Sequence, residues 1–323
     1  MTRRSYLDCI NAAMREEMER DPSVFLMGED VSFNFMGSTK GLAEQFGPGR
    51  VRNTPISEAG FLGAAAGAAM VGMRPIVDMM IAPFLYPAFD QLVSIIAKSS
   101  YLYGGQTHIP VVIRAAMFYN IGTAAQHSDR PIATVMTIPG LKVVVPASPS
   151  DAKGLIKTAI RDDDPVIVFE DRSFWAESED VPDEEYLIPF GQAAVRQAGT
   201  DVTIVGIAGG VTAALRAGER LRARGISAEV IDPRTLVPLD LDAILRSVAK
   251  TGRLVVVDIC HDTCSVASHI AALVAERGFD SLRGPIVRVT TPQIPIPFSP
   301  AMERPLFPSA DRVEEAAVKL VSR

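Results

Sequence analysis

The stretch Lys142-Val143-Val144-Val145 is followed by a helical pattern over residues 150–161 and then by a second apolar run, Val166-Ile167-Val168-Phe169. Short apolar runs rich in β-branched residues are typical of strands buried on both faces of a sheet. A strand, a helix and a second strand in succession form the crossover unit of a parallel sheet. This stretch therefore predicts an α/β fold with a mostly parallel sheet.

The same alternation continues in both directions along the chain. Before this stretch we expect helices over residues 5–20 and 88–98 and strands over 24–27, 75–80 and 110–114. After it we expect strands over residues 202–207, 228–231, 254–258 and 286–289 and helices over 211–225 and 264–278. Strands that alternate with helices at this spacing predict parallel sheets flanked by helices throughout the chain.

One segment interrupts this rhythm. Residues 177–185 are acidic, contain a proline and offer almost nothing to bury. Such composition is typical of the connection between two domains. We therefore predict two domains, residues 1–185 and residues 186–323, each a mostly parallel sheet flanked by helices.

Composition restricts the class of protein. The 323 residues are 48% hydrophobic and carry a formal net charge of -6, which argues against nucleic acid or an anionic membrane as a partner. No apolar run reaches the roughly 18 residues of a transmembrane helix, and residues 1–20 lack the apolar core of a signal peptide. The three cysteines fit a reduced, cytoplasmic protein better than a disulfide scaffold. Cys260 and Cys264 flank His261, but a zinc site needs about four ligands.

Glu58 is the first candidate for chemistry. It follows Thr54-Pro55-Ile56-Ser57 and precedes a Gly- and Ala-rich helical stretch. A glutamate in a first helical turn also suits the helix dipole, so one reading is structural. The other reading is a carboxylate at the entrance of a slim helix that a flat ligand can approach closely.

His127 and an acidic turn are two further candidates. His127 lies in a small polar segment, Gln126-His127-Ser128, that reads as a loop, where a histidine is either solvated or placed for proton transfer. Asp162-Asp163-Asp164 precedes Pro165 between a helix and a strand. It is either a solvated turn or a cation site built from carboxylates and carbonyl oxygens.

Several motifs occur together and in order. They are Gly28-Glu29-Asp30-Val31, Thr54-Pro55-Ile56-Ser57-Glu58, Asp90-Gln91, Gln126-His127-Ser128, Pro139-Gly140-Leu141-Lys142, Asp151-Ala152-Lys153-Gly154 and Asp232-Pro233-Arg234-Thr235. In this series the chain resembles the β subunits of thiamine-diphosphate-dependent pyruvate, branched-chain 2-oxoacid and acetoin dehydrogenases. The C-terminal segment around Pro295-Ile296-Pro297-Phe298 is most similar to the acetoin type.

The resemblance implies a pyrimidine-binding transketolase-like domain followed by a transketolase C-terminal-like domain. It implies that Glu58 hydrogen-bonds the cofactor's pyrimidine ring, that Glu29 lines the cofactor site and that Phe84 stacks on the pyrimidine. His127 matches the family's active-site histidine. The resemblance also implies a structural potassium site at Val111, Ala159, Ile160, Asp162 and Asp164.

A missing motif implies a partner. The family holds the diphosphate and Mg²⁺ with a Gly-Asp-Gly motif, and this sequence contains none. The resemblance therefore implies an α subunit that supplies that half of the site in an α2β2 heterotetramer. It further implies a 2-oxoacid or acetoin as substrate and a lipoyl-bearing acyltransferase as acceptor.

Three segments depart from the family's pattern: residues 115–120, 129–131 and 171–175. The bulky part of the first, Met117 to Asn120, favours an alternative function, a carboligase or decarboxylase subunit that uses no lipoyl acceptor. A non-catalytic scaffold subunit is a third reading. The presence of Glu58, Phe84 and His127 argues against that third reading.

Overall fold

The computed structural model describes residues 1–322. Its contacts divide the chain into two compact units. Unit 1 consists of residues 1–118 and 134–190, and unit 2 consists of residues 119–133 and everything from Gly191 onward. The loop 119–133 therefore packs with the second half of the chain. The predicted limits 1–185 and 186–323 stay a prediction of where two domains begin and end.

Unit 1 is built on a parallel sheet. Its strands lie in the order β6-β7-β5-β4-β2-β3 and all run in the same direction. Their bounds are β2 (Val24–Gly28), β3 (Val51–Asn53), β4 (Arg74–Ile81), β5 (Val112–Met117), β6 (Lys142–Val144) and β7 (Val166–Asp171). Every residue of β2, β5 and β7 is buried, which explains the continuous apolar runs in the sequence.

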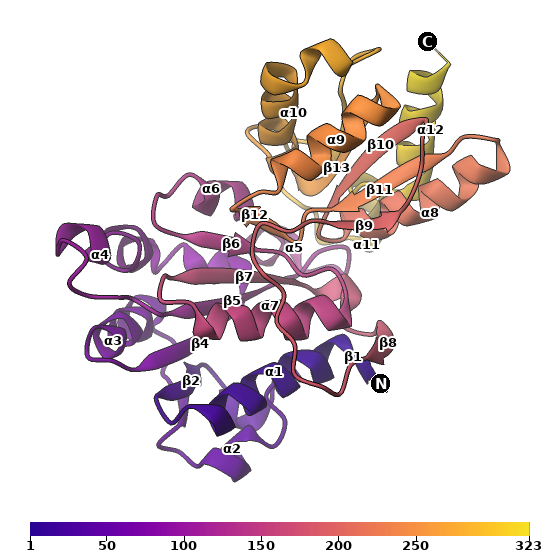
Figure 1. Cartoon of the computed structure of the whole chain (residues 1–323). Helices are drawn as coiled ribbons and strands as arrows, with labels where there is room; N and C mark the ends of the chain where they lie inside the picture. The colour runs from indigo at the N-terminus through magenta and orange to yellow at the C-terminus, as the bar shows by residue number, and fades with distance from the viewer. Residues whose placement is uncertain (323) are drawn as a thin grey trace. The chain divides into compact units, whose positions relative to one another are not determined.

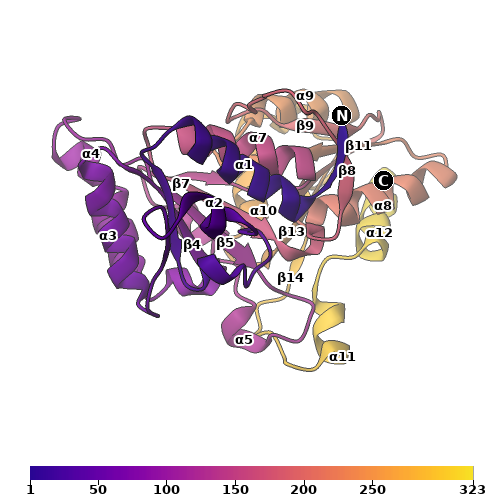
Figure 2. The ribbon, with the colours of Figure 1, turned by 90° about the horizontal axis from the view of Figure 1, so that it is seen from below.

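Helices cover this sheet. Helix α1 (Tyr6–Arg20) packs against α7 (Pro149–Arg161), and Figure 2 shows the two side by side. Helix α3 (Glu58–Met70) packs on β4 and on the π-helix η3 (Gln91–Ile96). The short elements of this unit are β1 (Thr2–Ser5), η1 (Val31–Phe33), α2 (Leu42–Phe46), η2 (Ala82–Leu85), α4 (Ser99–Leu102), η4 (Arg172–Phe174) and β8 (Ser178–Val181). Helix α6 (Ile132–Met136) begins in the residues of unit 2 and ends in those of unit 1.

Two segments differ from the sequence-based expectation. The regular helix expected over residues 88–98 is a π-helix over 91–96, in which the Ala97 amide reaches back five residues to the Leu92 carbonyl. The acidic segment 177–185 is not wholly a connection, because β8 pairs antiparallel with β1 and Val181 is buried. The pairing of β8 depends on a partner, β1, that is distant in sequence.

Unit 2 repeats the architecture. Its sheet has the order β14-β13-β10-β11-β9, parallel except for β9 at one edge. The bounds are β9 (Ala194–Gln197), β10 (Val202–Ile207), β11 (Ala228–Asp232), β13 (Leu254–His261) and β14 (Val287–Thr291). Helices α8 (Gly210–Ala223) and α12 (Ala310–Val321) cover one face, and α9 (Leu241–Thr251) and α10 (Val266–Arg277) cover the other (Figure 1). The short elements are α5 (Ala124–His127), β12 (Thr235–Val237), η5 (Phe279–Ser281), α11 (Pro300–Glu303) and η6 (Arg304–Leu306).

The predicted α/β class with mostly parallel sheets is confirmed in both units. Within residues 1–322, no helix is both long and apolar enough to span a membrane.

Candidate active site

The predicted cofactor residues of unit 1 come from segments that follow its parallel strands. Glu29 follows β2, Glu58 begins the helix after β3, and Phe84 lies in η2 after β4. Because the strands are parallel, their carboxyl ends meet at one edge of the sheet, where ligands of α/β proteins usually bind. The fold therefore directs these three segments to a single edge.

A glycine delivers Glu29 to this edge. Gly28 pairs with Asp78 of β4 and has a φ of +155°. A side-chain carbon on Gly28 would lie 2.5 Å from the carbonyl oxygen of Asp78. Only glycine fits this turn without moving β4, so the residue that precedes Glu29 is fixed by packing.

The charge of Glu58 acts on Glu29. Burial raises the pKa of Glu29, and the negative charge of Glu58 raises that pKa further. The Oε1 atom of Glu29 and the hydroxyl of Thr54 are both buried without a hydrogen-bond partner in the described residues. Buried polar atoms are rarely left unpaired, so such atoms indicate a place where a ligand supplies the missing partner.

The structure places Glu58 at the first position of α3. The Ser57 side chain does not cap this helix, so the first-turn amides lack the usual side-chain acceptor. The helix that follows, Glu58–Met70, is built almost entirely of small residues. Glu58 is only partly buried, so its carboxyl group is accessible at the positive end of a slim helix.

A buried arginine supports the same edge of the sheet. The Arg114 guanidinium donates to both carboxylate oxygens of Glu170 at 2.6 and 3.0 Å, to Asp78 at 3.1 Å and to the Ser38 hydroxyl at 2.8 Å. Burial alone would lower the pKa of Arg114, but the two carboxylates hold it above its usual range. Arg114 therefore stays charged and ties β4, β5 and β7 to the loop after β2.

His127 belongs to the other unit. It is the last residue of the short helix α5 and its side chain is exposed. Glu29, Glu58 and Phe84 all belong to unit 1, whereas His127 belongs to the 119–133 loop of unit 2.

The residues expected to bind potassium lie at the opposite ends of the strands. Two of the expected carbonyl oxygens, those of Ile160 and Asp162, accept hydrogen bonds from Arg74 at 2.9 and 2.5 Å. The Val111 carbonyl accepts from the amide of Val166 at 3.0 Å. A carbonyl oxygen has two lone pairs, so one hydrogen bond leaves the second available to a cation.

The carboxylates of the acidic turn are paired. The Lys142 ammonium lies 2.7 Å from a carboxylate oxygen of Asp162 and 3.1 Å from one of Asp164. Its positive charge offsets part of the negative charge of this turn. Within residues 1–322, no group of three or more His, Cys, Asp or Glu side chains is arranged to hold a metal ion. Cys260, His261 and Cys264 therefore form no such group.

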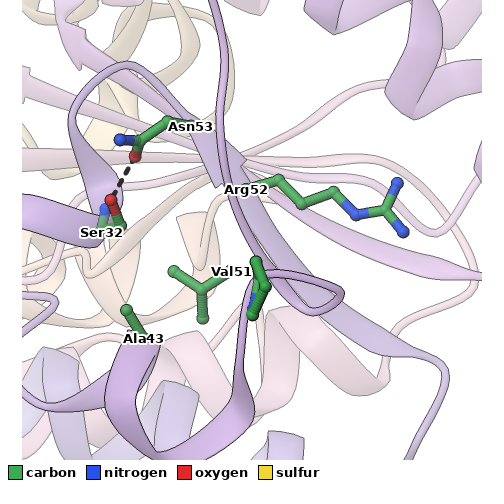
Figure 3. Close-up of a pocket in the computed structure, with 6 residues that line it drawn as sticks. Ser32, Ala43, Val51, Arg52 and Asn53 are labelled. Carbon is green, nitrogen blue, oxygen red and sulfur yellow. Dashed lines mark hydrogen bonds between the residues drawn. The ribbon is translucent and has the colours of Figure 1, made fainter.

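A pocket of about 560 Å³ opens beside β3 (Figure 3). It is lined by Ser32, Ala43, Pro48, Val51, Arg52 and Asn53. The Ser32 amide donates to the Asn53 side chain at 2.8 Å, and Figure 3 shows the Arg52 side chain directed away from the other lining residues. The lining offers no carboxylate or imidazole, so we assign it no chemistry.

Comparison with known families defines the class of fold. Residues 3–176 match the family described as "Transketolase, pyrimidine binding domain", and residues 191–313 match "Transketolase, C-terminal domain". A solved structure described as a split-gene transketolase, an inactive β4 tetramer, superposes with a TM-score of 0.81 at 24% identity and covers 98% of each chain. The two units thus have the fold of transketolase-type proteins.

Curated relatives narrow this class. The β subunit of acetoin:2,6-dichlorophenolindophenol oxidoreductase from Bacillus subtilis (strain 168) is 44% identical over 98% of this chain and 97% of its own length. The 2-oxoisovalerate dehydrogenase subunit beta of the same organism is 42% identical, covering 98% of each chain. The pyruvate dehydrogenase E1 component subunit beta of Rickettsia felis is 45% identical, covering 97% of each. The chain belongs to this family of 2-oxoacid and acetoin dehydrogenase β subunits, and the predicted resemblance is confirmed.

Sequence reasoning missed several residues at or near the site. Thr54 was quoted in a motif but not singled out, since a lone hydroxyl carries little signal. The contacts of Arg114 join residues 38, 78 and 170, which no local pattern connects. Arg130 lies in the segment 129–131 that departs from the family's pattern, but nothing in the sequence indicated that its side chain is buried.

Proposed function

We propose that this chain is the β subunit of a heteromeric thiamine-diphosphate-dependent dehydrogenase that decarboxylates a 2-oxoacid or cleaves acetoin and passes the acyl group to a lipoyl domain. The observation that carries the proposal is the pair Glu29 and Glu58, with one unpartnered buried oxygen on Glu29 and a raised pKa. Membership of the dehydrogenase β-subunit family supports it.

Glu29, Glu58 and Phe84 fit a pyrimidine cofactor. When bound, thiamine diphosphate supplies a nucleophilic carbon that adds to the carbonyl carbon of the substrate. In the proposal, the Glu58 carboxyl group hydrogen-bonds a ring nitrogen of the pyrimidine and shares a proton with it. Glu29 accepts a hydrogen bond from the same ligand through its orphaned oxygen, and Phe84 offers an aromatic face for stacking.

A partner subunit completes the proposed site. The sequence has no Gly-Asp-Gly motif, so we assign the diphosphate and Mg²⁺ mainly to an α subunit in an α2β2 heterotetramer. The names of the relatives, each a β subunit, support this division of the enzyme between chains. We place the assembly in the cytoplasm, with a lipoyl-bearing acyltransferase as its acceptor.

We assign proton transfer near the acceptor to His127. Its exposed position in a polar loop suits a group that meets an incoming substrate. We propose that potassium binds at Val111, Ala159, Ile160, Asp162 and Asp164, through the carbonyl oxygen of Val111 and of several of the others, with Lys142 offsetting the carboxylates of the turn.

Reconstitution with an α subunit tests the function. The chain alone with cofactor and Mg²⁺ should not turn over 2-oxoacids or acetoin, and the pair should. Acylation of a lipoyl domain by the pair supports the dehydrogenase. Turnover of the pair without any lipoyl acylation would favour the carboligase, and turnover by this chain alone would overturn the shared site.

Glu58→Gln tests the site within the reconstituted pair. The amide cannot share a proton with the pyrimidine, so hydrogen–deuterium exchange at the reactive cofactor carbon should slow by roughly 10²-fold or more. Glu44→Gln is the matched control, because Glu44 also lies in the first turn of a helix of unit 1 and is exposed. Equal exchange rates in the two variants would contradict the assignment of Glu58.

A further inference from the structure

The loop 119–133 has an irregular backbone that depends on outside support. Asn120, Gly122 and Ala124 all have positive φ values, of +59°, +74° and +59°. Glycine and, less readily, asparagine adopt this conformation, but alanine rarely does so unless neighbouring structure holds it there. Since His127 lies three residues after Ala124, whatever enforces this backbone also sets where the imidazole points.

The first support is Glu303. It is fully buried, and its carboxylate accepts hydrogen bonds from the backbone amides of Asn120 and, at 2.7 Å, Gly122. The Thr123 and Ser128 hydroxyls bond each other at 2.7 Å across the base of α5. These contacts fix the first half of the loop and reach Ser128, but they do not tie the segment after His127 to the rest of unit 2.

The second half is held by Arg130. Only 6% of this residue is exposed. Its guanidinium donates to the carbonyl of Ile259 at 2.9 Å and to the carbonyl of Ser128, the residue after His127. The Cys260 thiol donates to the backbone carbonyl of Arg130 at 3.5 Å, so side chain and backbone are both anchored on the end of β13.

Two aromatic rings enclose the same guanidinium. Its central carbon lies 5.6 Å from the ring centre of Tyr119 and 4.9 Å from that of Phe307, and the two rings are 4.7 Å apart. Tyr119 is the first residue of the loop and Ser128 lies near its end. Arg130 therefore joins both ends of the loop to one another and to the body of unit 2.

The remaining nitrogen of Arg130, Nη2, is buried and has no hydrogen-bond partner in the described residues. This nitrogen is buried and does not face solvent. Arg130 contacts backbone carbonyls and rings of unit 2, and its charge also acts on the buried carboxylate of Asp258 in the same unit, so the arrangement suits a clamp rather than a binding site.

We propose that Arg130 is a positioning residue that clamps the loop 119–133 onto unit 2 and thereby orients His127. This inference rests on the proposed role of His127 in proton transfer. A misplacement of about 1 Å in a reacting group typically lowers the rate by roughly 10²-fold. Loss of the clamp should therefore affect the step that uses His127 more than substrate binding.

The test uses Arg130→Met in the reconstituted αβ assembly, with Arg253→Met as matched control. Arg253 also donates to two backbone carbonyls of unit 2, those of Leu320 and Asp201, but does not contact the loop. We expect kcat for lipoyl acylation to fall by roughly 10- to 100-fold in Arg130→Met, with KM changed less than about 3-fold. The control should keep kcat. If Arg130→Met does not fold, Tyr119→Leu is the substitute, because it removes one of the two rings that enclose the guanidinium. We expect it to lower kcat by a smaller factor.

A double variant separates positioning from general destabilisation. If Arg130 acts through His127, then Arg130→Met combined with His127→Ala should be no slower than His127→Ala alone. Multiplicative losses would show that Arg130 acts independently of His127 and would overturn the proposal. Arg130→Lys should recover only part of kcat, since an ammonium lacks the planar fork that reaches both carbonyls.

Hydrogen exchange of the loop amides distinguishes failure of the Arg130 clamp from failure of the proposed function of His127. Peptides covering residues 119–133 should exchange faster in Arg130→Met than in Arg253→Met. Unchanged exchange would show that no clamp exists. Faster exchange together with full activity of His127→Ala would overturn the role of His127, and with it the positioning role, while leaving the loop contact established.

Discussion

Two neighbouring residues, Phe118 and Tyr119, each stack with an arginine, but the two arginines are held very differently. Phe118 ends unit 1 and contacts Trp175 in an edge-to-face arrangement at 5.4 Å, with Arg172 at 5.6 and 5.8 Å from the two rings. We call Phe118, Arg172 and Trp175 the rim cluster. Tyr119, Arg130 and Phe307 form the loop cluster of unit 2.

Ring stacking alone does not distinguish the two clusters, whereas burial and hydrogen bonding do. Arg172 is exposed, and within residues 1–322 it makes ring contacts but pairs with no carboxylate. Arg130 is buried and donates to two carbonyls. A cation over a ring contributes about 0.5–1 kcal/mol when exposed and about 2 kcal/mol when desolvated. The same pair of groups thus defines a weak surface contact in one unit and a structural anchor in the other.

Arg114 is the most deeply buried of the three arginines, and its substitution should cause the largest loss of stability. Arg114→Met would leave the carboxylates of Glu170 and Asp78 buried without a counter-charge. Breaking a buried ion pair by removing one partner typically costs about 3–5 kcal/mol. We expect urea unfolding of unit 1 to shift accordingly. Adding Glu170→Gln should recover part of the loss, and a double variant as unstable as the single one would contradict the charge argument.

Arg130→Met should show the next largest effect on stability. Two carbonyl oxygens lose a charged donor, and each such bond contributes about 1.5–3 kcal/mol. The methionine stem keeps some contact with the rings of Tyr119 and Phe307, so we expect a net loss of about 2–4 kcal/mol. The measurement is the urea midpoint of unit 2 at constant m-value. A loss below about 1 kcal/mol would mean that Arg130 is no better anchored than Arg172.

The sequence predicts the regular parts of these units better than their clusters. The strand expected at residues 202–207 has the same bounds as β10, because a parallel strand that is buried on both faces consists of a continuous apolar run. The amphipathic helix α12 was missed, although Val313, Ala317 and Leu320 lie on its buried face. The edge strand β9 was also missed, since it is only four residues long and none of its residues is fully buried.

The candidate site was predictable only through short motifs. Glu29 and Glu58 are 29 positions apart, and nothing local shows that their charges interact. Family motifs marked both, whereas Arg130 has no motif. Its role depends on Ile259 and Phe307, which lie far from it in sequence and approach only through the fold of unit 2. Long-range contacts of this kind leave no periodic signal.

Arg172→Met should change stability by less than about 1 kcal/mol, since it removes only exposed ring contacts. The measurement is the urea midpoint of unit 1, with the edge-to-face contact of Phe118 and Trp175 intact in the variant. A loss comparable to that of Arg130→Met would show that the rim cluster is a second anchor and would remove the distinction between the two clusters.

The smallest expected effect concerns the pH dependence caused by Glu29, a partly buried group that forms no ion pair within residues 1–322. Its pKa is raised in the folded chain by burial and by the charge of Glu58. As pH rises above the unfolded value of about 4.3, the unfolded chain ionises first, so stability falls until pH reaches the raised folded pKa.

Glu29→Gln removes this titration. The stability of that variant relative to wild type should therefore increase with pH above about 4 and become constant once folded Glu29 is ionised. Glu58→Gln should shrink the same difference, because it removes one of the charges that raise the pKa of Glu29. Urea midpoints between about pH 4 and pH 8 measure both. In one contrary outcome, the stability difference between Glu29→Gln and wild type does not vary with pH, and in another, Glu58→Gln leaves its variation unchanged. Either result would show that the charge of Glu58 does not act on Glu29 and would weaken the pairing on which the proposed cofactor site rests.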